Sequence, residues 1–501
     1  MSVRKHDQQS LLQKLKGLPT LIAALFALVG SGSSSAAEKP NVIFILMDDM
    51  GWRDVGFMGN TFIETPNLDR LAKEGLVFTS AYASAPNCAP TRACLMSGQY
   101  TPRHGIYTVV DPRQPPGSPW HKLQAADSLA ELNTNITTVA ESLKSGGYAT
   151  AFFGMWNLGR GRTGPVTPGG QGFDKVVFPE NLGFGKDEYF DGDGNYLSDR
   201  LTDSLLEFVE SNKDRPFFAY YPDHAVHAPY NPKPDLLKKY QQKMDSSGDR
   251  RDNAECAATV EAVDQNVGRI LQKLKDLKID QNTMIIFTSD NGGTNQYTAP
   301  LKGSKGQLYE GGIRIPLVVH WAGLKNPGRK CSVPVSSVDW FPTLVELTGA
   351  PTPSKQIQDG ISLMPLIEGG DSLKRDRLFW HFPSYVGKSA PSSAVRVGDY
   401  KLIEFFEDGG TTELYNLADD PNEENNLARS EPAKAKELYA ILQDWQKETG
   451  AAIPDKANPN YDPNAERPRG GPNGAGGGNA GGGGGGGKGQ GGMNKGKKGR
   501  R

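Results

Sequence analysis

Four continuous apolar runs set the strongest constraint on how this chain can fold. The first, Asn41–Met47, reads Asn-Val-Ile-Phe-Ile-Leu-Met, and similar runs recur at 217–221, 284–288 and 316–321. A run that is apolar at every position suits a strand buried on both faces, as in a sheet covered by helices. Stretches with helical patterning lie between these runs, at 138–145, 202–211 and 256–275. This alternation predicts an α/β domain in which a large sheet is sandwiched by helices.

The pattern changes after about residue 350. Shorter segments follow at 378–382, 393–397, 400–406 and 413–417, and a helical stretch covers 432–448. They predict a small C-terminal antiparallel sheet with one helix packed on it. From residue 464 the chain is mostly Gly, Asn and Lys, a composition that cannot bury enough apolar surface to fold. We therefore expect a domain at 38–350, an α+β subdomain at 351–463 and a basic tail at 464–501, which either binds an acidic surface or is only solvated.

The N-terminus has the features of an export signal. Lysines at 5, 14 and 16 precede an apolar stretch, Leu18–Val29, and small residues follow at 33–37. This order is typical of a cleaved signal peptide, here 1–37, and predicts a periplasmic or secreted protein. An uncleaved anchor is the alternative, but the stretch is shorter than the roughly 20 residues that span a bilayer. No later segment is apolar enough, so we expect no stable membrane insertion.

Charge and cysteine content narrow the possible partners. Lys and Arg number 56 against 57 Asp and Glu, a balance that gives no reason to expect nucleic acid as a partner. Of the four cysteines, Cys88 and Cys94 share one segment, while Cys256 and Cys331 lie far apart in sequence. A chain of this size does not need disulfides. We expect Cys94, Cys256 and Cys331 to be buried apolar residues, and Cys88 needs a different explanation.

Polar side chains follow three of the apolar runs. Asp48 and Asp49 come directly after the first run, and Asp290 and Asn291 follow the run at 284–288. Ligands of open α/β sheets gather at the carboxyl ends of strands, and oxygen ligands suit a hard cation such as Ca²⁺ or Mg²⁺. Taken alone, the two aspartates also fit helix capping and Asn-Gly fits a hairpin turn. His227 follows the run at 217–221 and suits general-acid work, although a lone histidine is more often structural.

The segment Cys88-Ala-Pro-Thr-Arg92 resembles the sulfatase family, whose pattern is Cys-x-Pro-Ser/Thr-Arg. Further segments typical of that family occur along the chain, at 65–72, 103–106, 171–174, 339–343, 359–363, 397–402 and 413–417. The resemblance extends from about residue 39 to 462. It implies the alkaline-phosphatase-like fold of sulfatases, with a large mixed sheet.

The resemblance also implies roles for individual residues. A maturation enzyme would oxidise Cys88 to formylglycine, whose hydrated aldehyde is the nucleophile, and Arg92 would lie beside it. Lys305 would bind the sulfate, and His227 would bind it and protonate the leaving oxygen. A single cation, Ca²⁺ in preference to Mg²⁺, would be held by Asp48, Asp49, Cys88, Asp290 and Asn291. The expected substrate is a sulfated small molecule or glycan.

One segment departs from the family pattern. Sulfatases usually carry Gly-Lys-Trp-His-Leu-Gly where this chain has Gly154-Met-Trp-Asn-Leu-Gly159. The family lysine binds sulfate, and the family histidine accepts a proton as sulfate leaves. Met155 cannot bind sulfate by charge, and Asn157 can hydrogen-bond to the substrate but cannot titrate. Loss of a general base costs on the order of 10²- to 10⁴-fold in rate.

Three functions are therefore compatible with the sequence. The first is a sulfuric ester hydrolase in which Lys305, His227, Arg92 and the cation sustain turnover, with a residue of the 160–162 loop replacing the missing charge. The second is a sulfated-glycan binder that keeps the pocket but turns over little. The third is a related phosphodiesterase or phosphonate hydrolase. We favour the first, because the metal ligands and the whole maturation motif are present.

Overall fold

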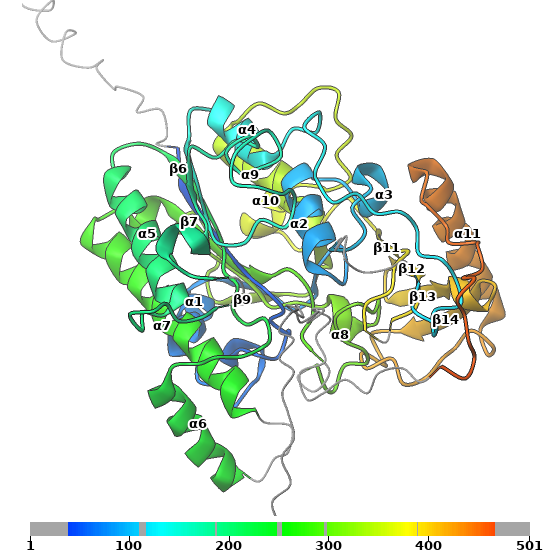
Figure 1. The fold of residues 1–501 in the computed structure, drawn as a ribbon. Coiled ribbons are helices and arrows are strands. Elements are labelled where there is room, and N and C mark those ends of the chain that lie inside the picture. The colour runs from blue at the N-terminus through cyan, green and yellow to red at the C-terminus, as the bar shows by residue number, and fades with distance from the viewer. Residues whose placement is uncertain are drawn as a thin grey trace, which may run out of the picture. The chain divides into compact units, whose positions relative to one another are not determined.

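A sheet of eight strands forms the centre of the larger part of the chain (Figure 1), in the order β5-β4-β6-β1-β7-β8-β2-β9. The computed structural model describes residues 39–109, 117–185, 188–247, 253–294, 298–387 and 389–465. The predicted signal peptide, and all of the predicted tail except residues 464 and 465, lie outside these ranges. Within the described residues, no helix has the length and apolarity needed to cross a membrane.

The sheet is mixed. Strand β1 (Asn41–Met47) lies between β6 (Phe217–Pro222) and β7 (Thr283–Ser289) and is parallel to both. Strand β4 (Ala149–Phe153) is parallel to β6, whereas β8 (Leu317–His320) is antiparallel to β7. Three strands are shorter: β5 (Lys175–Val177) and β9 (Arg329–Cys331) at the two edges, and β2 (Leu76–Phe78) next to β9. The predicted mixed α/β sheet is confirmed.

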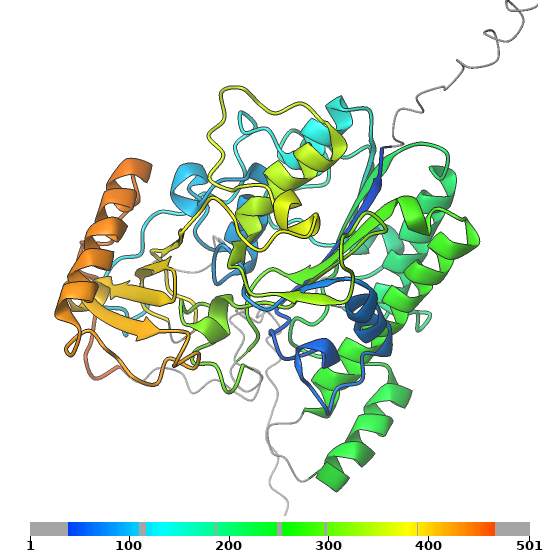
Figure 2. The same cartoon turned by 180° about the vertical axis from the view of Figure 1, so that it is seen from behind.

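Helices cover both faces of this sheet, as the views from the front and from behind show (Figures 1 and 2). Every residue of β1 is buried, with Ile43 and Ile45 in one core and Phe44 and Leu46 in the other. The first core is closed by α1 (Pro66–Glu74), α5 (Leu197–Ser211), α6 (Pro234–Ser247) and α7 (Ala254–Asp276). The second is closed by α2 (Cys88–Ser97), α4 (Val139–Ser145), α9 (Trp340–Thr348) and α10 (Met364–Ile367).

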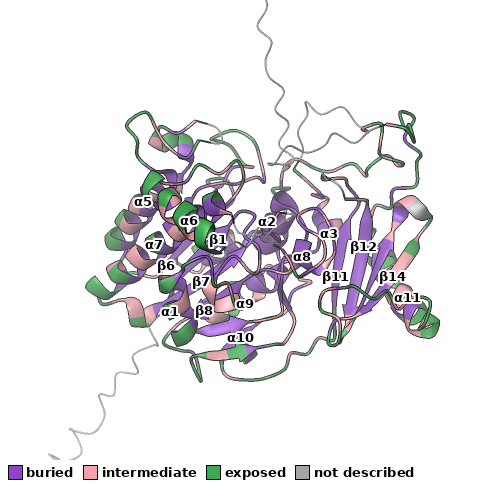
Figure 3. Cartoon of the chain, turned by 90° about the horizontal axis from the view of Figure 1, so that it is seen from below, coloured by how far each residue is buried: buried purple, intermediate pink, exposed green. Residues whose placement is uncertain are grey.

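A separate antiparallel sheet follows in the chain. It consists of β11 (Arg377–Phe382), β12 (Ser392–Val397), β13 (Tyr400–Phe405) and β14 (Thr411–Asn416). Helix α11 (Pro432–Thr449) covers one face, where Trp445 stacks on Phe379 with ring centroids 4.7 Å apart. The other face packs Trp380 and Ile403 against Tyr82 of the larger part. This confirms the predicted small sheet with one helix, and Figure 3 shows both sheets buried between their neighbours.

Several boundaries differ from the predictions. Helix α5 begins at Leu197 rather than at residue 202, because Leu197, Leu201 and Leu205 continue one buried stripe. Helix α6 was not predicted at all. The domain boundary at residue 350 stays a prediction, since the described residues from Pro40 to 465 group into one compact unit. The remaining short elements are β3 (Ala81–Tyr82), β10 (Val335–Ser336), α3 (Thr101–His104) and α8 (Glu310–Ile313).

The cysteines behave as the sequence indicated. All four are free and buried. Cys256 lies in the core on one side of the sheet, and Cys331 lies in the core on the other side. Cys94 packs in the core beneath the C-terminal sheet. These three are therefore packing residues, which leaves Cys88.

Candidate active site

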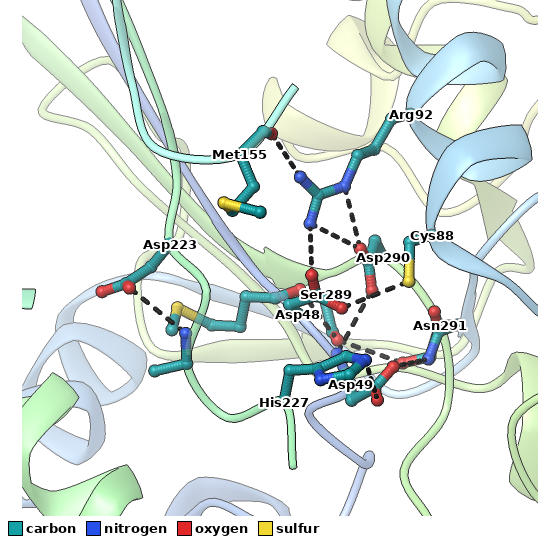
Figure 4. Close-up of polar contacts among 12 residues, drawn as sticks. Asp48, Asp49, Cys88, Arg92, Met155, Asp223, His227, Ser289, Asp290 and Asn291 are labelled. Carbon is teal, nitrogen blue, oxygen red and sulfur yellow. Dashed lines mark hydrogen bonds and ion pairs between the residues drawn. The ribbon is translucent and has the colours of Figure 1, made fainter. Parts of the chain in front are cut away.

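The ends of β1 and β7 bring the predicted metal ligands together. These parallel strands pair with Met47 opposite Ser289, so the residues that follow emerge at the same edge of the sheet. The backbone N–H of Asp290 donates to the carbonyl of Met47 at 3.0 Å, which extends the ladder by one residue. Asp49 then turns the chain with a φ of 65°, a left-handed conformation that aspartate tolerates better than most residues. Figure 4 shows the resulting cluster.

Cys88 joins this cluster from the first turn of α2. Its Sγ donates to Asp48 Oδ1 at 3.3 Å. One potential ligand atom from each of Asp48, Asp49, Cys88 and Asp290 lies within 4.8 Å of the others, and all four residues are buried. Burial of three carboxylates so close together is costly unless positive charge is also present.

The cluster fits a hard cation. Carboxylate oxygens are preferred ligands of Ca²⁺ and Mg²⁺. The amide of Asn291 donates from Nδ2 to Asp49 Oδ1 at 2.8 Å, while its buried Oδ1 has no hydrogen-bond partner among the described residues. Rotation of this amide would turn Oδ1 toward Asp49 and add another oxygen ligand. The predicted set of five ligand residues is thus assembled in one place.

Arg92 supplies one positive charge from the next turn of α2. Its side chain is 1% exposed, and it donates from Nε and an Nη to Asp290 at 3.0 and 2.8 Å. The same Nη donates to Asp48 at 3.0 Å, and the other Nη donates to the carbonyl of Met155. No hydrogen bond joins Arg92 to Cys88 among the described residues. Arg92 therefore orients the carboxylates of Asp48 and Asp290.

The charges within the cluster shift its acid–base equilibria. Burial raises the pKa of Asp290 to about 7, and the charge of Asp48 adds to this effect. Burial acts in the same direction on Asp48, but Arg92, His227 and Lys305 outweigh it and hold the pKa of Asp48 below its usual range. Burial and the Asp48 carboxylate raise the pKa of the Cys88 thiol. An unmodified Cys88 is consequently a protonated thiol and a weak nucleophile.

Lys305 supplies a second positive charge from the loop between β7 and β8. Its Nζ lies 2.7 and 2.9 Å from the two carboxylate oxygens of Asp49. Burial opposes the charged form, but the carboxylate of Asp49 raises the pKa of Lys305 well above its usual value. Lys302, in the same loop, turns away and donates to Tyr415 of the C-terminal sheet at 2.9 Å. Of the two lysines, Lys305 is the one that reaches the cluster.

His227 lies at the rim of the cluster. Its Nε2 is 3.6 Å from Asp49 Oδ2, and its side chain is 22% exposed, in contrast to the buried carboxylates. Its Nδ1 lies 2.6 Å from the carbonyl of Ala228. Donation from Nδ1 to this carbonyl would leave Nε2 directed toward the cluster, where a substrate would enter.

Two residues beside His227 were not predicted to belong to the site. The ring of His224 stacks on that of His227 with centroids 5.2 Å apart, and the ring of Tyr189 lies 5.4 Å from His224. The hydroxyl of Tyr189 donates to the carbonyl of His227 at 2.6 Å. The close spacing of His224 and His227 in the sequence could have indicated that both histidines belong to the site. The sequence did not indicate that Tyr189 belongs to the site, because Tyr189 and His227 lie 38 positions apart in the chain.

The segment that departs from the family pattern follows β4. Met155 N donates to Pro222 O at 2.9 Å, which ties the end of β4 to the end of β6. Gly154 has a φ of 131°, and a Cβ there would lie 1.9 Å from the same carbonyl, so only glycine fits. The contact that Figure 4 shows between Met155 and Arg92 is made by the Met155 carbonyl.

Asn157 stays outside the contacts of the cluster. It lies between the buried residues Trp156 and Leu158 and has a φ of 59°. Among the described residues, its side chain forms no hydrogen bond or ion pair. In the 160–162 loop, Arg162 pairs with Glu180 and lies over the ring of Phe178, so this arginine is engaged away from the cluster. The role of Asn157 in substrate binding remains a prediction.

Comparison with known proteins identifies the family. The sulfatase family pattern matches residues 40–350, and the pattern described as N-sulphoglucosamine sulphohydrolase, C-terminal, matches residues 304–448. A sulfatase of Formosa agariphila is 33% identical over 481 residues, which cover 80% of this chain and 86% of that protein. Human arylsulfatase A is 30% identical, with coverage of 82% and 88%. Canine N-acetylgalactosamine-6-sulfatase is 32% identical, with coverage of 74% and 73%.

Solved structures agree with this assignment. The crystal structure of Ps i-CgsB in complex with k-i-k-neocarrahexaose has a TM-score of 0.69 and 28% sequence identity, covering 83% of this chain and 95% of that one. A phosphonate monoester hydrolase of Agrobacterium radiobacter, 21% identical with a TM-score of 0.59, shares the fold and covers 82% and 96%. Matching residues, matching fold and the cluster around Cys88 lead to one conclusion: the chain belongs to the sulfatase family, whose members are enzymes that hydrolyse sulfate esters.

Proposed function

We propose that this protein removes sulfate from a sulfated glycan or aryl sulfate, with formylglycine made from Cys88 as the nucleophile and one bound Ca²⁺. The observation that carries the proposal is the buried cluster in which Cys88 lies among Asp48, Asp49 and Asp290. The basic side chains of Arg92 and Lys305 are already fixed against that cluster. We further propose export to the periplasm or medium, which the signal-like residues 1–37 support.

The relatives support a glycan as substrate class. Canine N-acetylgalactosamine-6-sulfatase carries its sugar substrate in its name, and Ps i-CgsB has been solved with a neocarrahexaose. Both are at least 28% identical to this chain over more than 70% of its length. These proteins act on their own substrates, so the position of the sulfate on the sugar is a separate question for this chain.

The residues around Cys88 divide the work of such a reaction. Arg92 holds Asp48 and Asp290 in place, so that both point at the same position. Lys305 presents an ammonium group that can turn from Asp49 to a sulfate oxygen. His227 lies partly exposed at the rim and can protonate the leaving oxygen from Nε2. Bound Ca²⁺ would polarise the sulfate oxygens, and formylglycine would supply the attacking hydroxyl.

Met155 and Asn157 make the elimination step the slow one. The family pattern places a charged residue and a titratable residue at these two positions, and neither is present here. Attack on sulfur can still proceed with Arg92, Lys305 and His227, but nothing at position 157 can accept the proton that must leave as sulfate departs. A sulfated enzyme intermediate should accumulate. The second candidate, a sulfated-glycan binder with little turnover, follows from the same two residues.

Peptide mass spectrometry of the exported protein across residues 80–103 tests the nucleophile. Formylglycine in place of Cys88 is the expected result, because residues 88–92 match the family's maturation pattern. An unmodified Cys88 in protein made by its own host would nearly exclude sulfatase catalysis.

Rapid mixing of the matured protein with an aryl sulfate tests the slow step. We expect a burst of phenol product equal to about one enzyme equivalent, followed by slow turnover, and a sulfate adduct on the peptide that contains residue 88. Linear product release from the first cycle would show that elimination is not rate-limiting. Tight binding of the sulfate ester with no burst would favour the binder.

A further inference from the structure

The loop that carries Lys305 is joined to the catalytic cluster by its backbone. Lys305 N donates to Gly293 O at 3.1 Å, and Gly292 N donates to Gly312 O at 3.0 Å. Gly306 N donates to the carbonyl of Pro86, two residues before Cys88, at 2.7 Å. A Cβ on Gly292 would lie 2.0 Å from the carbonyl of Gly311, so the loop and the Asn291 turn are packed without spare room. A shift of this loop would move both Lys305 and Asn291.

The same loop is held from outside by the C-terminal sheet. Glu310 opens α8, the short helix at the end of the loop, which lies between α2 and β11 in Figure 3. Lys401 of β13 reaches Glu310 Oε1 at 3.0 Å and Glu423 Oε1 at 3.0 Å. The backbone N–H of Glu310 donates to Glu423 Oε2 at 2.6 Å, and the hydroxyl of Tyr82 donates to Glu310 Oε2 at 2.8 Å.

These charges are removed from water. The side chains of Lys401, Glu310 and Glu423 are each at most 1% exposed. Arg314 adds a second cation 3.6 Å from Glu310, but Lys401 is the ammonium group that both carboxylates share. Its removal leaves excess buried negative charge, which is strongly unfavourable. Glu310 is therefore held in this position chiefly by Lys401 of β13, which lies closer to it than Arg314 does. Loss of Lys401 should drive Glu310 toward water and draw Gly311 and Gly312 with it.

We propose that Lys401 is a positioning residue, which through Glu310 fixes the 302–312 loop and so places Lys305 and the Asn291 turn around the cluster. The C-terminal sheet thus has a part in sulfate binding without touching the substrate. The importance of Lys305 for sulfate rests on the proposed function, whereas the mechanical link between Lys401 and the loop does not.

Amide hydrogen exchange and steady-state kinetics on the matured full-length Lys401→Met variant test this proposal. We expect faster exchange in peptides covering 298–312, together with about a tenfold rise in KM for an aryl sulfate and a smaller change in kcat. Arg375→Met is the matched control. It removes another buried cation, which pairs with Asp339 at 2.8 Å, and neither partner contacts the 302–312 loop.

The control separates positioning from general stability. If Lys401→Met and Arg375→Met lose similar stability but only the first loosens the loop and raises KM, the proposal holds. Equal exchange in the loop, or equal KM, in the two variants would overturn it. If Lys401→Met does not fold, Glu310→Gln decides by the same two measurements, because it keeps the shape but removes the charge. Absence of turnover in the unsubstituted protein would count against the proposed function alone, and loop exchange would still decide this inference.

Discussion

The ends of β1 and β4 lie at the same edge of one sheet, with only β6 between them, yet they carry opposite chemistry. After β1 come Asp48 and Asp49, buried carboxylates held by Arg92 and Lys305. After β4 come Met155 and Asn157, neither of which carries charge. The backbone is equally well fixed at both ends, by Asp290 N to Met47 O and by Met155 N to Pro222 O. On the proposed mechanism, this contrast leaves the metal and nucleophile half of the site complete and the half that assists sulfate departure reduced.

The largest expected effect on turnover comes from removing the nucleophile, which belongs to the complete half of the site. Cys88→Ala should lower turnover of an aryl sulfate by about 10⁴-fold or more, because no other group in the cluster can attack sulfur. Cys94→Ala, on the same helix but packed under the C-terminal sheet, should keep nearly full activity. Comparable loss in both variants would mean that the helix, and not the nucleophile, had been disturbed.

Restoring the family residues in the reduced half of the site should give the next largest change in turnover. The double substitution Met155→Lys with Asn157→His should raise steady-state turnover by about 10²- to 10⁴-fold, because it restores a sulfate-binding charge and a proton acceptor. The initial burst should then disappear, since elimination would no longer be slow. Each single substitution serves as a control for the other. No gain in the double variant would show that other residues already fill both roles.

Removal of the cation tests whether the complete half of the site binds Ca²⁺, because a bound cation stabilises the folded protein. Ca²⁺ at a hundredfold excess over its Kd should stabilise the folded protein by about 2.7 kcal/mol, visible as a rise in Tm that a chelator reverses. Asn291→Ala should weaken this response, because it removes the amide oxygen available at the cluster. Tighter binding of Mn²⁺ or Zn²⁺ than of Ca²⁺ would instead favour a phosphodiesterase or phosphonate hydrolase.

The smallest effect concerns a carboxyl group just beyond the end of β1. Asp54 accepts a hydrogen bond from Gly51 N at 2.7 Å, and burial raises its pKa to about 7. Between about pH 4 and 7 the folded protein binds a proton that the unfolded chain has lost, so stability falls as the pH rises through this range and the loss is complete above about pH 7. Asp54→Asn keeps the hydrogen bond and should gain more stability at pH 8 than at pH 5. An equal gain in denaturant unfolding at both values would contradict the raised pKa.

The sequence predicted those parts of the fold and site that depend on local pattern. Strand β1 was predicted with its observed limits, because burial on both faces leaves an unbroken apolar run. Asp48 and Asp290 were predicted to meet because parallel strands end at one edge of the sheet. Contacts between segments that are distant in the sequence could not be predicted from local pattern. Tyr189 beside His227, and Lys401 beside Glu310, depend on how the loops and the second sheet pack.

Position 157 shows a further limit. The comparison with the family pattern predicts that Asn157 binds substrate, which stays a prediction, and within the described part of the chain its side chain forms no polar contact with the cluster. The left-handed backbone at this position depends on the turn that begins at Gly154, and a sequence motif does not reveal where such a turn directs a short side chain. A histidine there would reach further than asparagine does.

The tight contact of Gly154 with the Pro222 carbonyl has a consequence for how this enzyme can change over generations. Because that contact fixes the backbone, the residues that follow can be exchanged without rebuilding the strand end. In the genetic code, methionine becomes lysine, and asparagine becomes histidine, by a change of one base each. On the proposed mechanism, the lysine and histidine of the family pattern are therefore two point mutations away, and a lineage under selection for faster desulfation has a short path to them.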